Sequence, residues 1–226
     1  MLARYVRHFE TVELNFSYYR VPNARTLDAI AAKTPDGFTF WVKANQETTH
    51  MLNRDVAPAF IEALEPMTAA GKLAGVLMQF PQSFHRTAGA RKYLSAALED
   101  FASVPLAVEF RHHSWDRPEV LEGLSERNVT VVIPDVPAIE ALYSPSPAVT
   151  TRTGYLRLHS RDASKWYAGA QARYDYNYTA ADIRKLLDAW SPLAGQTDRV
   201  YAFFNNCHHG QAAENALAMR RILRQI

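Results

Sequence analysis

Residues 105–115, "PLAVEFRHHSW", decide the fold class of this chain. The segment begins as an apolar strand and then places Glu109, Arg111 and two histidines within five residues. Because successive side chains of a strand point to opposite faces, Glu109 and Arg111 share one face. Charges of both signs do not usually end a buried strand for reasons of packing. The segment therefore predicts a strand that carries polar groups to a site.

Similar strands recur along the chain, and segments with helical spacing of apolar residues separate them. We predict strands over residues 11–15, 38–44, 74–80, 105–112, 129–135, 154–160 and 199–206. Helices are predicted over 23–34, 58–67, 90–101, 117–128, 179–190 and 213–226, with Thr179 and Asp116 as N-caps and Pro118 in a first turn. Apolar strands alternating with helices indicate a parallel sheet that is covered on both faces.

Each predicted strand carries a polar residue at or next to its C-terminal end, and this pattern distinguishes between two α/β architectures. An open doubly wound sheet binds its ligand only at the point where the strand order reverses, so most of its strands need no polar end. A closed barrel brings the C-terminal ends of all strands to one mouth. We therefore predict a TIM-type (β/α) barrel, with residues 1–226 as a single domain. The polar strand-end residues expected at its mouth are Glu13, Asn15, Lys43, Gln79, Glu109, Arg111, Asp135, Arg157, His159 and Asn205.

Composition limits the class of protein and its partners. The 226 residues are 48% hydrophobic and 21% charged, which is typical of a globular domain. A net charge of +2 without a basic run does not indicate nucleic-acid binding. The single cysteine, Cys207, excludes an internal disulfide. The sequence shows no signal-peptide pattern and no apolar run near the roughly 20 residues of a membrane span, so we expect a cytoplasmic protein with no membrane partner.

Several stretches follow one another in a recognisable order. They are "FETVELNFSYYRVP", "FTFWVKANQETTH", "LAGVLMQFPQSF", "LAVEFRHHSW", "GYLRLHSRD", "ARYDYNYTAADI" and "YAFFNNCHHGQAAENA". Together they resemble the DUF72 family, also called YecE-like proteins. The resemblance covers almost the whole chain and implies a TIM-barrel fold without an established biochemical function.

The chain departs from that family in two places. Ser160 stands where the family pattern has glycine after the strand histidine. The family also has a first strand with a Gly-Trp-Tyr motif, and no such segment precedes Met1. We therefore expect seven recognisable strands and a barrel that lacks the family's first one. A misassigned start codon, a true seven-stranded barrel and a homodimer that covers the gap all remain open.

The expected mouth has the residues for acid–base chemistry on an anion. Glu109 is the first candidate acid or base, with His159 as its complement, since a crowded ionisable site can shift pKa values as such chemistry requires. The planar guanidinium group of arginine recognises carboxylate or phosphate. Lys43, Arg111, Arg157 and Arg161 therefore indicate a small anionic metabolite, with phosphorylated compounds included. The predicted substrate-binding residues also include Glu13, Asn15, Gln79, Asp135, Tyr174, Tyr176 and Asn205.

Three hypotheses for function follow from these residues. The preferred one is an enzyme, or enzyme-like barrel, that needs no metal or other cofactor. The second is a metal-dependent phosphodiester hydrolase, because Glu109, Asp135 and His159 end consecutive strands and are common metal-ligand types. Arg111 and Arg157 share faces with two of them and would repel a cation. The third is a non-catalytic barrel that binds a metabolite.

Overall fold

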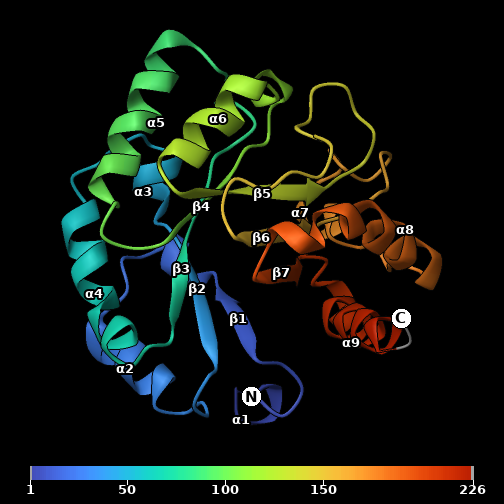
Figure 1. Cartoon of the computed structure of the whole chain (residues 1–226), viewed down its shortest axis with the longest axis horizontal. Helices are drawn as coiled ribbons and strands as arrows, with labels where there is room; N and C mark the ends of the chain where they lie inside the picture. Colours follow the sequence, from blue (N-terminus) through green and yellow to red (C-terminus); the bar gives the residue numbers. More distant parts are fainter. Residues whose placement is uncertain (1, 225–226) are drawn as a thin grey trace. The chain divides into compact units, whose positions relative to one another are not determined.

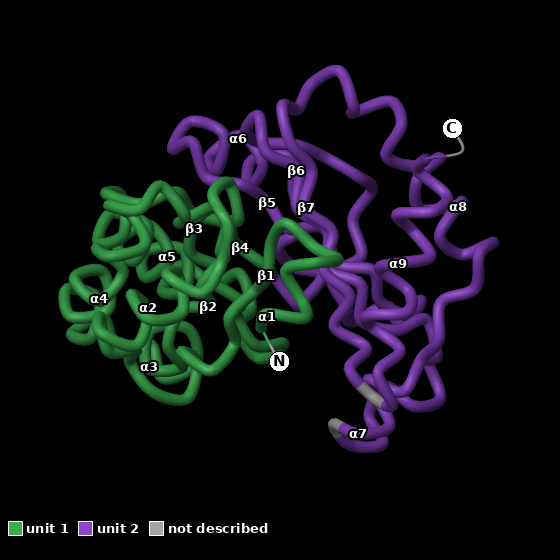
Figure 2. Tube along the Cα trace, turned by 90° about the horizontal axis from the view of Figure 1, so that it is seen from below, with its two compact units in different colours: residues 1–109 green, residues 110–226 purple. Residues whose placement is uncertain are grey.

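The computed structural model describes residues 2–224, apart from the side chains of residues 170 and 208. The chain divides into two compact units, one ending at Glu109 and the other beginning at Phe110 (Figure 2). Within residues 2–224, seven parallel strands alternate with helices, which confirms the predicted α/β fold of the TIM-barrel type with seven strands. The assignment of residues 1–226 to a single domain stays a prediction.

The first unit contains four parallel strands that neighbour one another in chain order (Figure 1). They are β1 (Thr11–Leu14), β2 (Thr39–Lys43), β3 (Leu73–Gln79) and β4 (Leu106–Glu109). Helix α4 packs against β3 and against α2. The helices of this unit are α1 (Leu2–Tyr5), α2 (Ala24–Ala31), α3 (Gln46–Thr49), α4 (Ala57–Ala69) and α5 (Ala88–Asp100), with the 3-10 turn η1 (Phe16–Tyr18).

The second unit contains three parallel strands, again neighbours in chain order. They are β5 (Val129–Asp135), β6 (Thr153–Leu158) and β7 (Arg199–Phe204). Helix α6 packs against β5, and α9 packs against both β7 and α8. The helices are α6 (Pro118–Glu126), α7 (Ala170–Arg173), α8 (Ala180–Trp190) and α9 (Gln211–Leu223), with 3-10 turns η2 (His113–Trp115), η3 (Ser191–Gln196) and η4 (His208–Gly210).

Two predicted helix starts had different outcomes. Thr179 is the N-cap of α8, as predicted, and Asp182 completes a capping box by accepting from the Thr179 backbone. The prediction for Asp116 was wrong, because α6 has Arg117 as its N-cap and no side-chain cap. Pro118 occupies the first turn of α6, which makes the preceding residue the cap, and Asp116 ends the turn η2 instead.

The central strands are buried as the apolar pattern predicts, whereas β1 is half-buried throughout and β7 begins with two exposed residues. Every residue of β4 is buried, and β3 and β5 are buried over most of their length. Trp41 of β2, only 2% exposed, packs beside Gly75 of β3 in the neighbouring strand. Among the described residues, no helix is both long enough and apolar enough to cross a membrane.

Gly75 provides a test of this packing. A Cβ atom at Gly75 would lie 2.5 Å from the Trp41 ring and 2.7 Å from the Pro105 carbonyl oxygen, and the latter is backbone that cannot turn away. We expect Gly75→Ala to lower the free energy of unfolding by about 1–3 kcal/mol, the usual cost of overpacking. Urea denaturation would measure it. Gly89→Ala in α5 is the matched control, since a Cβ there meets no atom closer than 3.9 Å. Equal stability of the two variants would contradict the close contact.

Candidate functional site

The polar residues at the strand ends of the second unit are fixed by backbone hydrogen bonds that extend the parallel ladder. The His159 amide donates to the Asp135 carbonyl at 3.0 Å, one residue beyond the end of β6. In the same way, the Asn205 amide donates to the Leu158 carbonyl at 2.7 Å beyond β7. The first residue after each strand therefore keeps strand-like geometry, and its side chain has a defined direction.

His159 lies between two other predicted site residues. Its Nε2 atom is 3.1 Å from Arg111 Nη2, and its Nδ1 atom is 3.1 Å from Asn205 Nδ2. His159 is fully buried and Arg111 is 9% exposed. The structure therefore brings Arg111, His159 and Asn205 together in one chain of polar contacts, which is buried at Arg111 and His159 and half-buried at Asn205.

Two further predicted residues belong to the same strand end or to the loop that follows it. Arg157 lies two residues before His159 on β6 and is 1% exposed. The Tyr174 ring lies 6.4 Å from the His159 ring, measured between centroids, at an interplanar angle of 45°. A guanidinium, an imidazole and a phenol ring thus come from strand β6 and from the segment just before α8.

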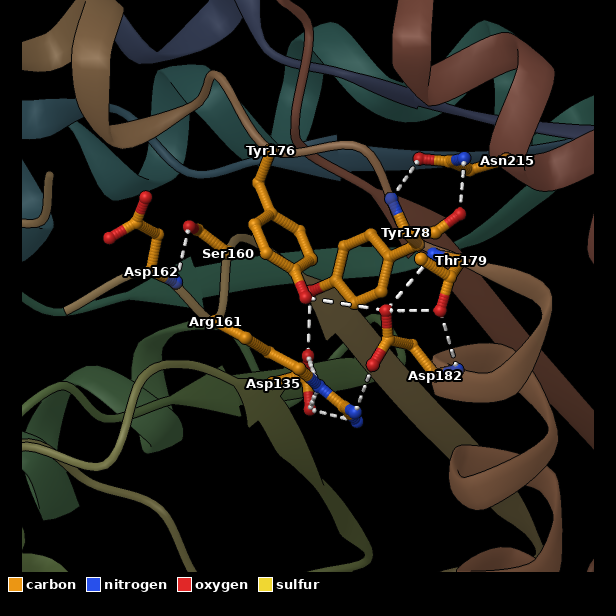
Figure 3. Close-up of polar contacts among 9 residues, drawn as sticks. All are labelled: Asp135, Ser160, Arg161, Asp162, Tyr176, Tyr178, Thr179, Asp182 and Asn215. Carbon is orange, nitrogen blue, oxygen red and sulfur yellow. Dashed lines mark hydrogen bonds and ion pairs between the residues drawn. The ribbon is translucent and has the colours of Figure 1, made fainter.

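Arg161 joins two carboxylates in a second group of predicted residues (Figure 3). Its Nε and Nη2 atoms both donate to Asp135, at distances of 2.9–3.1 Å. Its Nη1 atom donates to Asp182 at 3.1 Å. The Arg161 guanidinium group thus connects the end of β5 to the first turn of α8 through hydrogen bonds. A direct role of Asp135 or Arg161 in substrate binding stays a prediction.

Two tyrosines complete this group, and Figure 3 shows their hydroxyl groups directed at the carboxylates. Tyr178 donates to Asp135 at 2.6 Å, and Tyr176 donates to Asp182 at 3.3 Å. Burial, then the charge of Asp135, raises the pKa of Tyr178 far above its usual value. Burial and the charge of Asp182 also raise the pKa of Tyr176. Both phenols therefore stay protonated at physiological pH and act as donors.

Asn215 of α9 holds the backbone of this loop. Its Oδ1 atom accepts from the Tyr178 amide at 3.1 Å and from Asn206 Nδ2 at 2.7 Å, while its Nδ2 atom donates to the Tyr178 carbonyl at 3.1 Å. Sequence reasoning missed Asn215 and the roles of Tyr178 and Asp182. The spacing of Thr179 and Asp182 was a usable signal for Asp182, because an acidic residue three positions after the N-cap is typical of a capping box. No comparable pattern marks Asn215.

In the first unit, the structure brings Lys43 and Gln79 together. Lys43 Nζ donates to Gln79 Oε1 at 2.8 Å and lies 4.4 Å from the centroid of the Tyr18 ring. Sequence reasoning did not identify Tyr18. Hydrogen bonds from Ser17 to the Lys43 carbonyl and from Asn45 to the Ser17 carbonyl fix η1 beside the end of β2. The ammonium group of Lys43 is therefore oriented by an amide and an aromatic face.

The acidic residues of the first unit differ in burial. Glu109 is fully buried at the end of β4 and pairs in register with Gln79 of β3, so the two side chains lie on one face of neighbouring strands. Glu13 is half-buried on β1, whereas Asn15 is exposed just after that strand. The prediction that the residues of both units serve one common site stays a prediction.

The described residues include no ligand set to which a metal centre can be assigned. Within the described part of the chain, His, Cys, Asp and Glu side chains do not gather in any group of three or more that could hold an ion. Asp135, one of the ligands considered from the sequence, accepts hydrogen bonds from Arg161 and Tyr178.

Asp182 gives this region a testable pH dependence. Burial opposes its ionisation, but hydrogen bonds from Thr179 and the charge of Arg161 outweigh burial and lower its pKa below the ordinary 3.8. Its stabilising effect is therefore complete above about pH 4 and is lost as the pH falls through the lowered pKa. We expect Asp182→Asn to cost about 1 kcal/mol of stability at neutral pH and less in acid.

Urea unfolding at neutral and acidic pH would measure this difference. Asp188→Asn is the matched control, because Asp188 is an exposed residue of the same helix. A loss of stability for Asp182→Asn that is constant across pH would contradict the role of the carboxylate charge.

Comparison with known proteins assigns the chain to a family. The chain is 28% identical to the UPF0759 protein YunF of Bacillus subtilis (strain 168), over 98% of the chain and 86% of that protein. A solved DUF72 family protein from Thermotoga maritima MSB8 is 35% identical, with a TM-score of 0.89 over 98% of this chain and 90% of that one. A DUF72 family protein from Enterococcus faecalis V583 is 29% identical, with a TM-score of 0.90 over 99% and 88%. The model described as "Protein of unknown function DUF72" matches residues 1–226, and the chain belongs to this family.

Proposed function

We propose that this protein binds a small anionic metabolite, including phosphorylated compounds, and acts on it by metal-free acid–base chemistry. The observation that carries the proposal is the buried contact of Arg111 and Asn205 with the two nitrogens of His159. A guanidinium fork is suited to a carboxylate or phosphate group, and an imidazole at its side can accept or supply a proton near neutral pH.

Burial supports a functional role for this group. Arg111, Arg157 and His159 are each at most 9% exposed, although all three lie within two residues of the C-terminal end of a strand. Removing such polar groups from water is costly, and apolar side chains would often stabilise the same positions as well or better. A requirement for an anion-binding, proton-transferring site gives a reason for these residue types. In this proposal Arg111 and Arg157 hold the anionic group and His159 exchanges the proton.

Glu109 is the second proposed catalytic residue, acting as acid or base. Its complete burial at the end of β4 is an environment in which a carboxyl group can be tuned for proton transfer. Lys43 is proposed to hold the anionic group as well. The other proposed substrate-binding residues stay Glu13, Asn15, Gln79, Asp135, Arg161, Tyr174, Tyr176 and Asn205. A homodimer and a cytoplasmic location also stay predictions.

A ligand screen with arginine variants tests the binding part of the proposal. We expect at least one phosphorylated sugar, nucleotide or small carboxylate to raise the melting temperature, by about 5–10 °C at a hundredfold excess over its Kd. Arg111→Ala should abolish this shift. Arg152→Ala is the matched control, because Arg152 forms an exposed ion pair with Asp198 in the same unit. Arg111→Lys keeps the positive charge but lacks the planar guanidinium group. It replaces the alanine variant in this experiment if that variant does not fold. Undiminished shifts in both Arg111 variants would contradict the proposal.

A second measurement separates catalysis from simple binding. We expect Glu109→Gln to retain the ligand-induced shift in melting temperature and to lose about 100-fold or more of the turnover of that ligand, since general acid–base catalysis contributes on this scale. Product formation followed by NMR would report the rate. Turnover at the wild-type level at every pH would remove Glu109 from the mechanism. Saturable stabilisation without any turnover in the wild-type protein would favour the non-catalytic binding barrel.

A further inference from the structure

His159 makes contacts at both ring nitrogens, and the chemistry of its partners restricts where its proton can lie. Arg111 Nη2 is 3.1 Å from Nε2, and the Asn205 side chain is placed with Nδ2 3.1 Å from Nδ1. A guanidinium can only donate hydrogen bonds. Nε2 therefore accepts from Arg111 and carries no proton of its own.

The proton of a neutral imidazole must then lie on Nδ1, since one ring nitrogen is a donor whenever the other is an acceptor. The neighbour of Nδ1 has to accept this hydrogen bond. An asparagine amide has an oxygen and a nitrogen of nearly the same size, and hydrogen-bond partners decide which way it is turned. The Asn205 amide is consequently turned so that Oδ1 takes the position of Nδ2 and accepts from the Nδ1–H group.

The opposite orientation of the amide has no satisfactory proton arrangement. If the NH₂ group of Asn205 donated to Nδ1, both ring nitrogens would be acceptors, and a neutral imidazole has only one. The ring is fully buried, so an unsatisfied polar contact there would be costly.

We propose that Asn205 is a positioning residue that, together with Arg111, fixes His159 as the neutral Nδ1–H tautomer. The inference rests on the proposed function in one respect: it assigns Nε2 as the nitrogen through which His159 takes a proton. The ring lone pair on Nε2 accepts from Arg111 when no ligand is bound, and in this proposal Nε2 takes a proton once the Arg111 guanidinium turns to the bound anion. The ligand's anionic group and the basic nitrogen are thus both placed beside Arg111.

The backbone makes this arrangement suitable for side-chain replacement. The Asn205 amide bonds to Leu158 and the His159 amide bonds to Asp135, so both residues are held by main-chain contacts that do not involve their side chains. Asn205→Asp keeps the size and offers only acceptors at Nδ1. Asn205→Ala removes the partner altogether.

Nitrogen NMR of the full chain labelled with ¹⁵N-histidine tests the tautomer directly. The His159 signals are assigned by their loss in His159→Gln, and spectra are recorded without ligand at mildly alkaline pH. We expect a pyrrole-type Nδ1, a pyridine-type Nε2 and a protected Nδ1–H proton. Asn205→Asp should keep this pattern, whereas Asn205→Ala should lose the protected proton through exchange with water.

A pyrrole-type Nε2 in the wild-type protein would overturn the inference, as would loss of the Nδ1–H pattern in Asn205→Asp. The wild-type spectrum decides the tautomer even if a variant fails to fold. Failure of the ligand screen would overturn the proposed function and leave the tautomer standing. If the protein binds anions through Arg111 but His159 has the other tautomer, the proposed function stands and the inferred tautomer is overturned.

Discussion

The parallel hydrogen-bond ladder, continued one residue past the ends of the strands, is the constraint on which the candidate site depends. In the first unit Ala44 and Phe80 donate to the neighbouring strand just after β2 and β3. In the second unit His159 and Asn205 do the same after β6 and β7. Buried backbone groups must be paired, so these residues are held as firmly as the strands themselves. Polar side chains at these positions acquire fixed directions without needing a loop to order them.

Burial then makes each polar contact directional and chemically restrictive. An exposed Arg or His can exchange partners with water, but Arg111 and His159 have little solvent to turn to. The same holds for Asp135, which accepts from Arg161 and Tyr178 at once. In such surroundings, the donor or acceptor character of one group decides the proton position of the next. The guanidinium of Arg111 and the imidazole of His159 are the clearest case.

The sequence was most informative for helices and strands in which the periodic spacing of apolar residues, or a capping residue, marks the element. The strand around Glu109 and the helix after Thr179 could be predicted because burial imposes alternation on the first and a capping residue marks the second. The contact of Lys43 with Gln79 also agrees with their expected positions at neighbouring strand ends. The contacts of Arg161 and Tyr178 were harder to predict. Both residues lie in an irregular segment without hydrophobic periodicity, and only the folding of that segment brings them to Asp135. Asp116 was placed wrongly because a 3-10 turn, whose residues carry no distinct pattern, precedes the helix.

Asn215 has a consequence for the order in which the second unit assembles. It belongs to the last helix, yet it holds the main chain of Tyr178, which precedes α8 by only two residues. The chain around Tyr174 and Tyr176 therefore has its anchor about 40 residues downstream. During synthesis on the ribosome this segment would have to wait for α9 to emerge before it could settle. The segment that carries Tyr174, Tyr176 and Tyr178 can therefore complete its folding only after the C-terminal helix α9 has been synthesised.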